Sequence, residues 1–229
     1  MTPTVILFDI DGTLISCGGA GRLAMKAALR DIAGCDEPLD FEFAGGTDRS
    51  IARRALEGAG RSADEPAIDV FLARYLERLP VMLASIDRYH VHDNVLGVLA
   101  SLERRDGFAI GLGTGNVEAG ARAKLRRGQL SERFAFGGFG CDHEERKRLI
   151  AIGAERGAAR LGVAREACRV VIVGDTPKDV EAALAIGAEC LGVGTGPHTP
   201  GELREAGATL VCDDLSDPRA SAMLLGAAR

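Results

Sequence analysis

Two aspartates follow a short apolar run in the segment Val5-Ile6-Leu7-Phe8-Asp9-Ile10-Asp11-Gly12-Thr13-Leu14. Four consecutive apolar residues are typical of a buried strand in a parallel sheet, and Gly12 predicts a turn directly after it. Ligands of open α/β sheets bind at the carboxyl ends of the strands, so Asp9 and Asp11 are candidates for catalysis or metal binding. The alternatives are an aspartate that caps a turn and a calcium loop, in which Asp-x-Asp-Gly also occurs.

The segment that follows this strand has helical spacing. We expect helices at about residues 22–33, 49–58 and 64–83, with Asp48 as the N-cap of the second, and no strand between residues 16 and 88. The third helix has one apolar face, formed by Ile68, Phe71, Leu72, Tyr75, Leu76 and Leu79. The sequence therefore predicts an all-helical insertion.

Strands and helices alternate from residue 89 onward, which is typical of βαβ units in a parallel sheet covered on both faces. The expected strands are 108–113, 134–137, 170–174, 189–193 and 209–212. The expected helices are one capped by Asp93 that ends at 105, then 118–127, 144–160, 178–186, 200–206 and 218–226. We expect a doubly wound, Rossmann-like α/β core of residues 1–15 and 89–229 with a helical cap domain of residues 16–88.

Composition limits the partners. A net charge of −5 with acids and bases interspersed gives no basic surface for nucleic acid. The six cysteines form no C-x-x-C pair, so we expect reduced thiols and no zinc site. No apolar run approaches about 18 residues, and the first residues do not resemble a signal peptide. We expect a cytoplasmic protein without a membrane partner, as a monomer or homodimer.

Polar residues follow two further strands at the point where each strand ends. Thr114, Gly115 and Asn116 offer a hydroxyl and backbone N–H groups at a helix start, which suits an anion. Asp175 and Asp179 follow the strand at 170–174. Parallel strands end at one edge, so these groups should converge with Asp9 and Asp11. Carboxylates gathered without a cation would repel one another, and their hard oxygen atoms favour Mg²⁺.

The chain resembles the haloacid dehalogenase-like superfamily of aspartate-nucleophile hydrolases. The resemblance is carried by Asp9-Ile10-Asp11-Gly12-Thr13-Leu14, by Thr114, and by Gly174-Asp175-Thr176-Pro177-Lys178-Asp179, and it extends over essentially the whole chain. It implies that Asp9 is the nucleophile, forming a transient aspartyl phosphate, and that Asp11 is the general acid and base.

The resemblance also implies that Thr114 holds a phosphoryl oxygen. It further implies that Asp9, Asp175 and Asp179 bind Mg²⁺ together with Asp11, which binds through its backbone carbonyl. The remaining expected substrate contacts are Gly12, Thr13, Gly115 and Asn116.

One part of the chain departs from the family pattern, which commonly has a lysine before the helix that follows the third core strand. Here the sequence reads His143-Glu144-Glu145-Arg146-Lys147-Arg148. Adjacent helical residues point in different directions, so only one base can reach the phosphate. We expect Arg146 or Lys147, with Arg146 preferred; the alternative is a solvated basic face.

The acid at position 11 favours a phosphatase over a dehalogenase. The segment Ala44-Gly45-Gly46-Thr47-Asp48-Arg49 resembles a cap loop of phosphoglycolate phosphatase-like members, so Thr47, Arg49 or Arg22 would contact the leaving group. We expect a Mg²⁺-dependent phosphatase for a small phosphorylated metabolite, with phosphoglycolate as the leading candidate. The alternatives are a phosphosugar mutase, a haloacid dehalogenase and a non-catalytic binding module.

Overall fold

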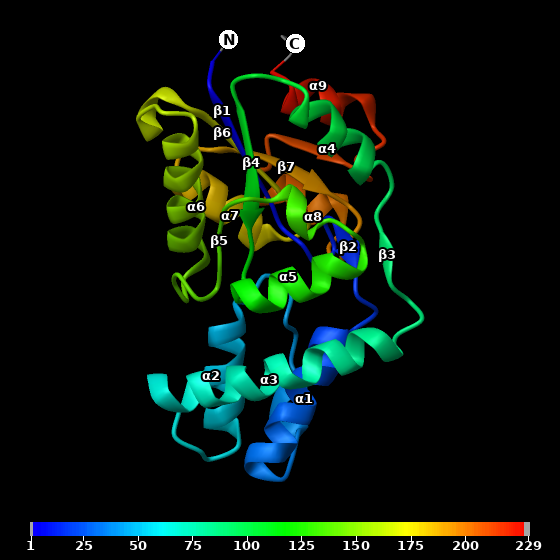
Figure 1. Ribbon diagram of the computed structural model, residues 1–229, viewed down its shortest axis with the longest axis vertical. Helices are drawn as coiled ribbons and strands as arrows, with labels where there is room; N and C mark the ends of the chain where they lie inside the picture. Colours follow the sequence, from blue (N-terminus) through cyan, green and yellow to red (C-terminus); the bar gives the residue numbers. More distant parts are fainter. Residues whose placement is uncertain (1, 227–229) are drawn as a thin grey trace.

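A six-stranded parallel sheet forms the centre of the protein, which the computed structural model describes over residues 2–226 (Figure 1). Its strands are β1 (Thr4–Phe8), β4 (Phe108–Gly113), β5 (Gly137–Gly138), β6 (Arg169–Gly174), β7 (Glu189–Val193) and β8 (Leu210–Cys212). They lie in the order β5-β4-β1-β6-β7-β8, with β1 paired in parallel to both β4 and β6. The predicted doubly wound α/β class is confirmed.

Helices cover both faces of the sheet, because successive side chains of a strand point to opposite faces. Val5 and Leu7 of β1 belong to one buried cluster, and Ile6 and Phe8 belong to the other. The first cluster includes α6 (Arg146–Arg160), α7 (Pro177–Ala185) and α8 (Pro200–Glu205), and the second includes α4 (Val95–Glu103), α5 (Glu118–Arg127) and α9 (Pro218–Leu224). The short 3₁₀ turns are η1 (Glu37–Leu39), η2 (Ser131–Arg133) and η3 (Arg165–Ala167).

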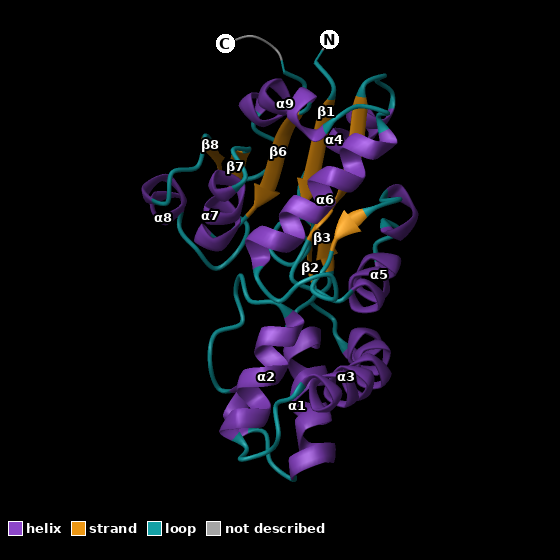
Figure 2. Ribbon diagram, turned by 90° about the vertical axis from the view of Figure 1, so that its left-hand side faces the viewer, coloured by secondary structure: helices purple, strands orange, loops and turns teal. Residues whose placement is uncertain are grey.

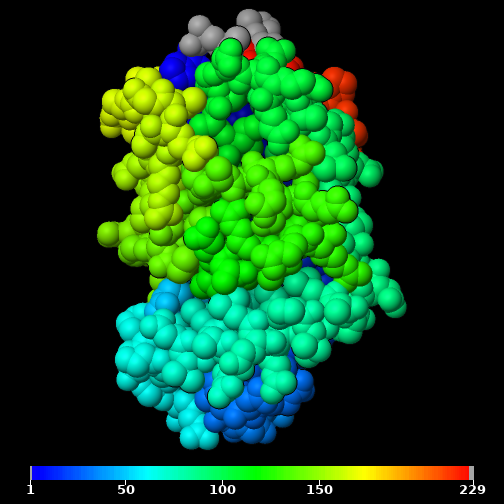
Figure 3. Space-filling model, viewed as in Figure 1, coloured from blue at the N-terminus to red at the C-terminus, as the bar shows by residue number. Residues whose placement is uncertain are grey.

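The helices α1 (Ala20–Ala33), α2 (Asp48–Gly58) and α3 (Glu65–Ser85) form the end of the molecule beyond the carboxyl edge of the sheet (Figures 1 and 2). None of the described residues from 17 to 89 lies in a strand. The apolar face expected on the third helix is buried except for Leu76, which is partly buried, and Phe71 and Tyr75 are 0% exposed. Figure 3 shows this helical segment, in blue and cyan, in direct contact with the sheet-bearing part.

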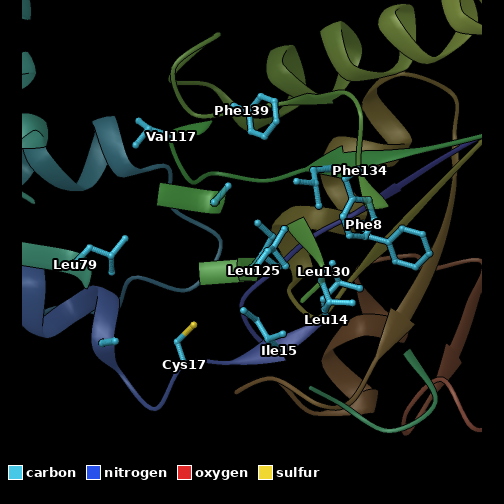
Figure 4. Close-up of a cluster of buried hydrophobic side chains, with 14 of the residues drawn as sticks. Phe8, Leu14, Ile15, Cys17, Leu79, Val117, Leu125, Leu130, Phe134 and Phe139 are labelled. Carbon is cyan, nitrogen blue, oxygen red and sulfur yellow. The ribbon is translucent and has the colours of Figure 1, made fainter. Parts of the chain in front are cut away.

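One apolar cluster runs without a break from the sheet into the helical segment. Figure 4 shows part of it, with Phe8 and Leu14 near the sheet and Leu79 of α3 at the far side. Buried apolar area stabilises by about 25 cal/mol per Å², so this shared core favours the two parts staying together.

Two very short strands were not expected. β2 (Ile15–Ser16) pairs antiparallel with β3 (His90–Val91), where the chain leaves the sheet for the helical segment and returns from it. Two-residue strands are too short for an alternating pattern, so sequence reasoning could not find them.

A strand is present where one was expected at 134–137, but the bounds were wrong: β5 contains only Gly137 and Gly138. Phe134 does not extend the ladder: it is buried in the second cluster, with its ring tilted against that of Phe8 and the two ring centres 6.2 Å apart.

Two expected N-caps were also wrong. Helix α4 begins at Val95 after Asn94, whose φ of 58° places it in the left-handed region, and no side chain caps this helix. Helix α2 is capped by Thr47 in a capping box with Ser50, and Asp48 is the first residue of the helix. Among residues 2–226, no helix combines the length and apolarity needed to span a membrane.

Candidate active site

The carboxyl ends of three neighbouring strands bring chemically active side chains to one cavity. Phe8 is in register with Leu112 on one side and with Val173 on the other, so Asp9, Thr114 and Asp175 follow their strands at nearly the same level. A cavity of about 480 Å³ opens at this edge, lined by residues from both the sheet-bearing part and the helical segment.

Asp9, Asp175 and Asp179 form a buried acidic cluster. One carboxylate oxygen from each lies within 4.8 Å of the others. Burial, followed by the charges of Asp179 and Asp9, raises the pKa of Asp175 well above its ordinary value, and burial raises the pKa of Asp9 to about 6. Within residues 2–226, Oδ2 of Asp175 has no hydrogen-bond partner. A buried acceptor without a donor and a set of hard oxygen atoms fit a divalent cation.

Glycines make this cluster possible. A Cβ at Gly12, whose φ is +87°, would lie 2.4 Å from Oδ2 of Asp175, and one at Gly196 would lie 1.8 Å from the same atom. The Thr13 hydroxyl donates to Oδ1 of Asp175 at 2.8 Å. Thr13 therefore orients a carboxylate here, whereas the family resemblance implies a substrate contact for it.

Arg146 points into the site and Lys147 does not. Nη2 of Arg146 lies 2.6 Å from Oδ1 of Asp179 and 3.1 Å from Oδ2 of Asp9, and 8% of its side chain is exposed. Burial alone would lower the pKa of Arg146, but the charges of Asp179 and Asp9 outweigh burial and raise it. Lys147 faces outward, 60% exposed, beside Glu145 at 3.5 Å. Arg146 and Lys147 are adjacent on a helix, so their side chains point in different directions around its axis.

The Asp11 carboxylate is held by two donors rather than by the acidic cluster. Nζ of Lys124 lies 2.6 Å from Oδ2 of Asp11, and Nδ2 of Asn116 donates to the same oxygen at 3.0 Å. Enclosure of Asp11 would raise its pKa, but the ammonium of Lys124 and these hydrogen bonds outweigh it and lower the pKa. The carboxylate of Asp11 is thus kept ionised and oriented toward the cavity that it lines.

The loop after β4 carries the Thr114 hydroxyl, which we expected at this edge of the sheet. The Thr114 hydroxyl is fully buried and accepts from Nδ2 of Asn116 at 2.8 Å. Gly115 allows a close approach of the helical segment, since a Cβ there would lie 2.3 Å from the carbonyl oxygen of Gly46. Thr114, Gly115 and Asn116 all line the cavity, as do Gly12, Asp9 and Asp11.

Thr47 and Arg49 are placed away from the leaving-group role expected for them. The Thr47 hydroxyl caps α2 and donates to the Glu144 carbonyl at 3.0 Å. The Arg49 guanidinium pairs with Asp69 at 2.8 Å and with Glu65, on α3, and does not line the cavity. Arg22 does line it, with its guanidinium 3.9 Å from the centre of the Phe43 ring.

Asp48 joins the helical segment to the loop after β4. Its backbone N–H donates to the Gly115 carbonyl at 2.8 Å, and its carboxylate accepts from the Val117 N–H at 2.8 Å. Burial raises the pKa of Asp48 to about 6. Nearby, the Arg53 guanidinium binds the Glu144 carboxylate in a forked contact, with its shortest distance at 2.8 Å.

Sequence reasoning missed Lys124 and misjudged Tyr75. Lys124 is one of only four lysines among 28 basic residues, which was the available signal, but nothing in its helix indicates a contact with Asp11. Tyr75 matched the apolar face of its helix, and it nevertheless lines the cavity.

A family model described as haloacid dehalogenase-like hydrolase matches residues 3–187. The chain belongs to the haloacid dehalogenase-like hydrolase family. The expectation of an enzyme, a hydrolase of this family, is confirmed. The family match covers the acids at positions 9, 11, 175 and 179 and the base at 146.

Two named relatives of this haloacid dehalogenase-like hydrolase are phosphatases. Phosphoglycolate phosphatase of Rhodospirillum rubrum is 31% identical over 221 residues, covering 93% of this chain and 88% of the relative. Probable phosphatase IndB of Dickeya dadantii is 28% identical over 232 residues, covering 95% and 92%. CbbY of Rhodobacter sphaeroides, solved in complex with phosphate, matches with a TM-score of 0.73 at 21% identity, covering 95% and 96%, which supports the fold.

The raised pKa of Asp48 predicts that the free energy of unfolding depends on pH. The folded-state pKa of about 6 lies above the ordinary value of 3.8, so the folded protein holds the extra proton between these pH values, and this group makes the free energy of unfolding fall as pH rises through them. Asp48→Asn keeps an acceptor for Val117 and removes the charge. In urea unfolding without added metal, we expect the variant to match the parent below pH 4 and to exceed it by about 2–3 kcal/mol at pH 8.

Asp106→Asn, at an exposed position, is the control and should show no such pH-dependent difference. A difference between Asp48→Asn and the parent that stays constant from pH 4 to 8, or a less stable variant at pH 8, would contradict this assignment.

Proposed function

We propose that this hydrolase is a Mg²⁺-dependent phosphatase that releases phosphate from a small metabolite through an aspartyl phosphate on Asp9. The observation that carries the proposal is the contact of Arg146 with Asp9 beside two further buried acids. This arrangement supports the proposal, because transfer of a highly charged phosphoryl group requires a nucleophile, a positive charge and a metal site close together.

The residues divide the work as follows. An Asp9 carboxylate oxygen forms the new bond to phosphorus while the ester bond breaks, and Asp11 gives a proton to the leaving oxygen. Asp11 then removes a proton from the water that hydrolyses the aspartyl phosphate. Lys124 and Asn116 keep Asp11 ionised for this second half, and the negative charge of an arriving phosphate raises its pKa for the first half.

Phosphoryl oxygens are held by Arg146, the Thr114 hydroxyl and the N–H groups of the following loop. Mg²⁺ bound by Asp9, Asp175 and Asp179, and by the Asp11 carbonyl, would neutralise charge on the phosphoryl group. We propose residues 16–88 as a cap domain that covers the site, on the strength of the contacts that Asp48 and Arg53 make with the rest of the chain.

Phosphoglycolate is the proposed substrate, because a named relative at 31% identity over 93% of this chain is a phosphoglycolate phosphatase. The Asp11 carboxylate, oriented by two donors, supports a phosphatase over a dehalogenase, whose chemistry has no need of an acid at this place. Six free thiols support a cytoplasmic location, where thiols stay reduced.

The proposal is tested with p-nitrophenyl phosphate and a panel of phosphorylated metabolites that includes phosphoglycolate. We expect phosphate release that requires Mg²⁺ and is abolished by EDTA. Asp9→Asn should lower kcat by at least about 1,000-fold while the protein stays folded, because it removes the nucleophile. Folded protein that binds Mg²⁺ and hydrolyses no ester would contradict the proposal and favour the non-catalytic binding module.

The two adjacent bases make a matched pair. We expect Arg146→Lys to lower kcat by about 100-fold or more. Nη2 of Arg146 contacts both Asp9 and Asp179, and the planar guanidinium keeps further N–H donors for a phosphoryl group that a lysine ammonium does not present in the same geometry. Lys147→Ala should stay within twofold of the parent, because Lys147 faces outward. Equal losses in the two variants, measured at saturating Mg²⁺ with thermal midpoints as a check on folding, would argue against the role of Arg146.

A further inference from the structure

The Tyr75 hydroxyl is a buried polar group without a partner. Tyr75 lies on α3, is 0% exposed and lines the cavity. Within residues 2–226 its oxygen has no hydrogen-bond partner. Folded proteins seldom keep a buried hydroxyl unsatisfied, because the lost hydration is not recovered. The missing hydrogen bond of this hydroxyl therefore indicates that a ligand supplies the partner.

The Lys124 ammonium reaches the same place from α5. A Cβ at Gly21 would lie 3.2 Å from Nζ of Lys124 and 3.9 Å from the Tyr75 hydroxyl. Both groups thus lie beside one glycine, and all three residues line the cavity. An ammonium has three N–H donors, and Asp11 and Asn116 accept two of them. One donor of Lys124 and the hydroxyl of Tyr75 remain for a ligand.

We propose that Tyr75 and Lys124 bind a carboxylate on the leaving group of the substrate. The inference rests on the phosphatase function proposed above and deepens it. If Asp11 contacts the leaving oxygen, two successive hydrogen bonds place the Lys124 ammonium within about 5–6 Å of that oxygen. A carboxylate one carbon from the ester oxygen is within reach of an ammonium at that distance.

The charged groups around this subsite favour a hydrogen-bond acceptor on the ligand. Arg22 adds a guanidinium to the cavity wall. Two acids are also close: Asp11 is paired with Lys124, and Asp48 accepts the Val117 N–H. The Lys124 ammonium can only donate and the Tyr75 hydroxyl can donate, so a carboxylate satisfies both groups. An alkyl group leaves both unpaired, and an ammonium group leaves the Lys124 donor unpaired.

The test measures binding rather than turnover. Asp9→Asn and Asp9→Asn/Tyr75→Phe are titrated by calorimetry, in Mg²⁺, with phosphoglycolate, 2-hydroxyethyl phosphate and ethyl phosphate. We expect the loss of the Tyr75 hydroxyl to raise the dissociation constant for phosphoglycolate about tenfold. The dissociation constant for ethyl phosphate should change less than twofold. The thermal midpoint of the ligand-free Tyr75→Phe protein should be unchanged or higher, because an unsatisfied group is removed.

Tyr89→Phe is the matched control. The chain has only two tyrosines, and the Tyr89 hydroxyl donates to the Lys124 backbone carbonyl at 3.0 Å without lining the cavity. Its removal should leave phosphoglycolate binding within twofold of the parent.

Equal weakening of phosphoglycolate and ethyl phosphate by Tyr75→Phe would overturn the subsite, as would a loss confined to 2-hydroxyethyl phosphate or no binding of phosphoglycolate at all. Selective weakening of phosphoglycolate supports the subsite even if the parent hydrolyses no ester, a result that would count against the phosphatase function alone.

Discussion

Three buried carboxylates lie close together in this protein, and the repulsion among them has to be compensated by positive charge in the active site. Asp9, Asp175 and Asp179 approach within 4.8 Å of one another, with exposures of 7%, 1% and 0%. Arg146 compensates part of this charge from within the same site. One guanidinium cannot balance three acids, so the cluster keeps affinity for a further cation, and this imbalance is what makes the site suited to a metal and a phosphate together.

The fold brings these carboxylates together through backbone geometry. Parallel strands end at a common edge, and β1 lies between β4 and β6, so residues more than a hundred positions apart meet there. Gly12 and Gly196 leave room for the Asp175 carboxylate. Thr176 caps α7 in a capping box with Asp179, which fixes the third acid by two hydrogen bonds to its carboxylate. The helical segment lines the other side of the cavity and contacts the sheet-bearing part through Asp48, Thr47 and Arg53.

The strand ends could be predicted from the sequence because buried apolar runs and the acids after them are adjacent in the chain. The positions of Asp9, Thr114 and Asp175 follow from that pattern and from the parallel topology alone. Lys124 and Tyr75 could not be predicted this way, because their importance depends on how α3 and α5 are oriented against each other. For the same reason Thr47 and Arg49 were assigned to the leaving group, whereas one caps a helix and the other pairs with α3. Local pattern identifies the acidic edge, and tertiary packing decides which side chains from the helical segment face it.

The central claim is that Asp9 and Asp175 share one cation. Mn²⁺ accepts the same oxygen ligands as Mg²⁺ and is located directly by anomalous X-ray scattering. In crystals grown with Mn²⁺, this account predicts one strong anomalous peak bound by a carboxylate oxygen of Asp9 and one of Asp175, each within about 2.5 Å. A peak elsewhere, or a cation bound by only one of these two aspartates, would contradict it.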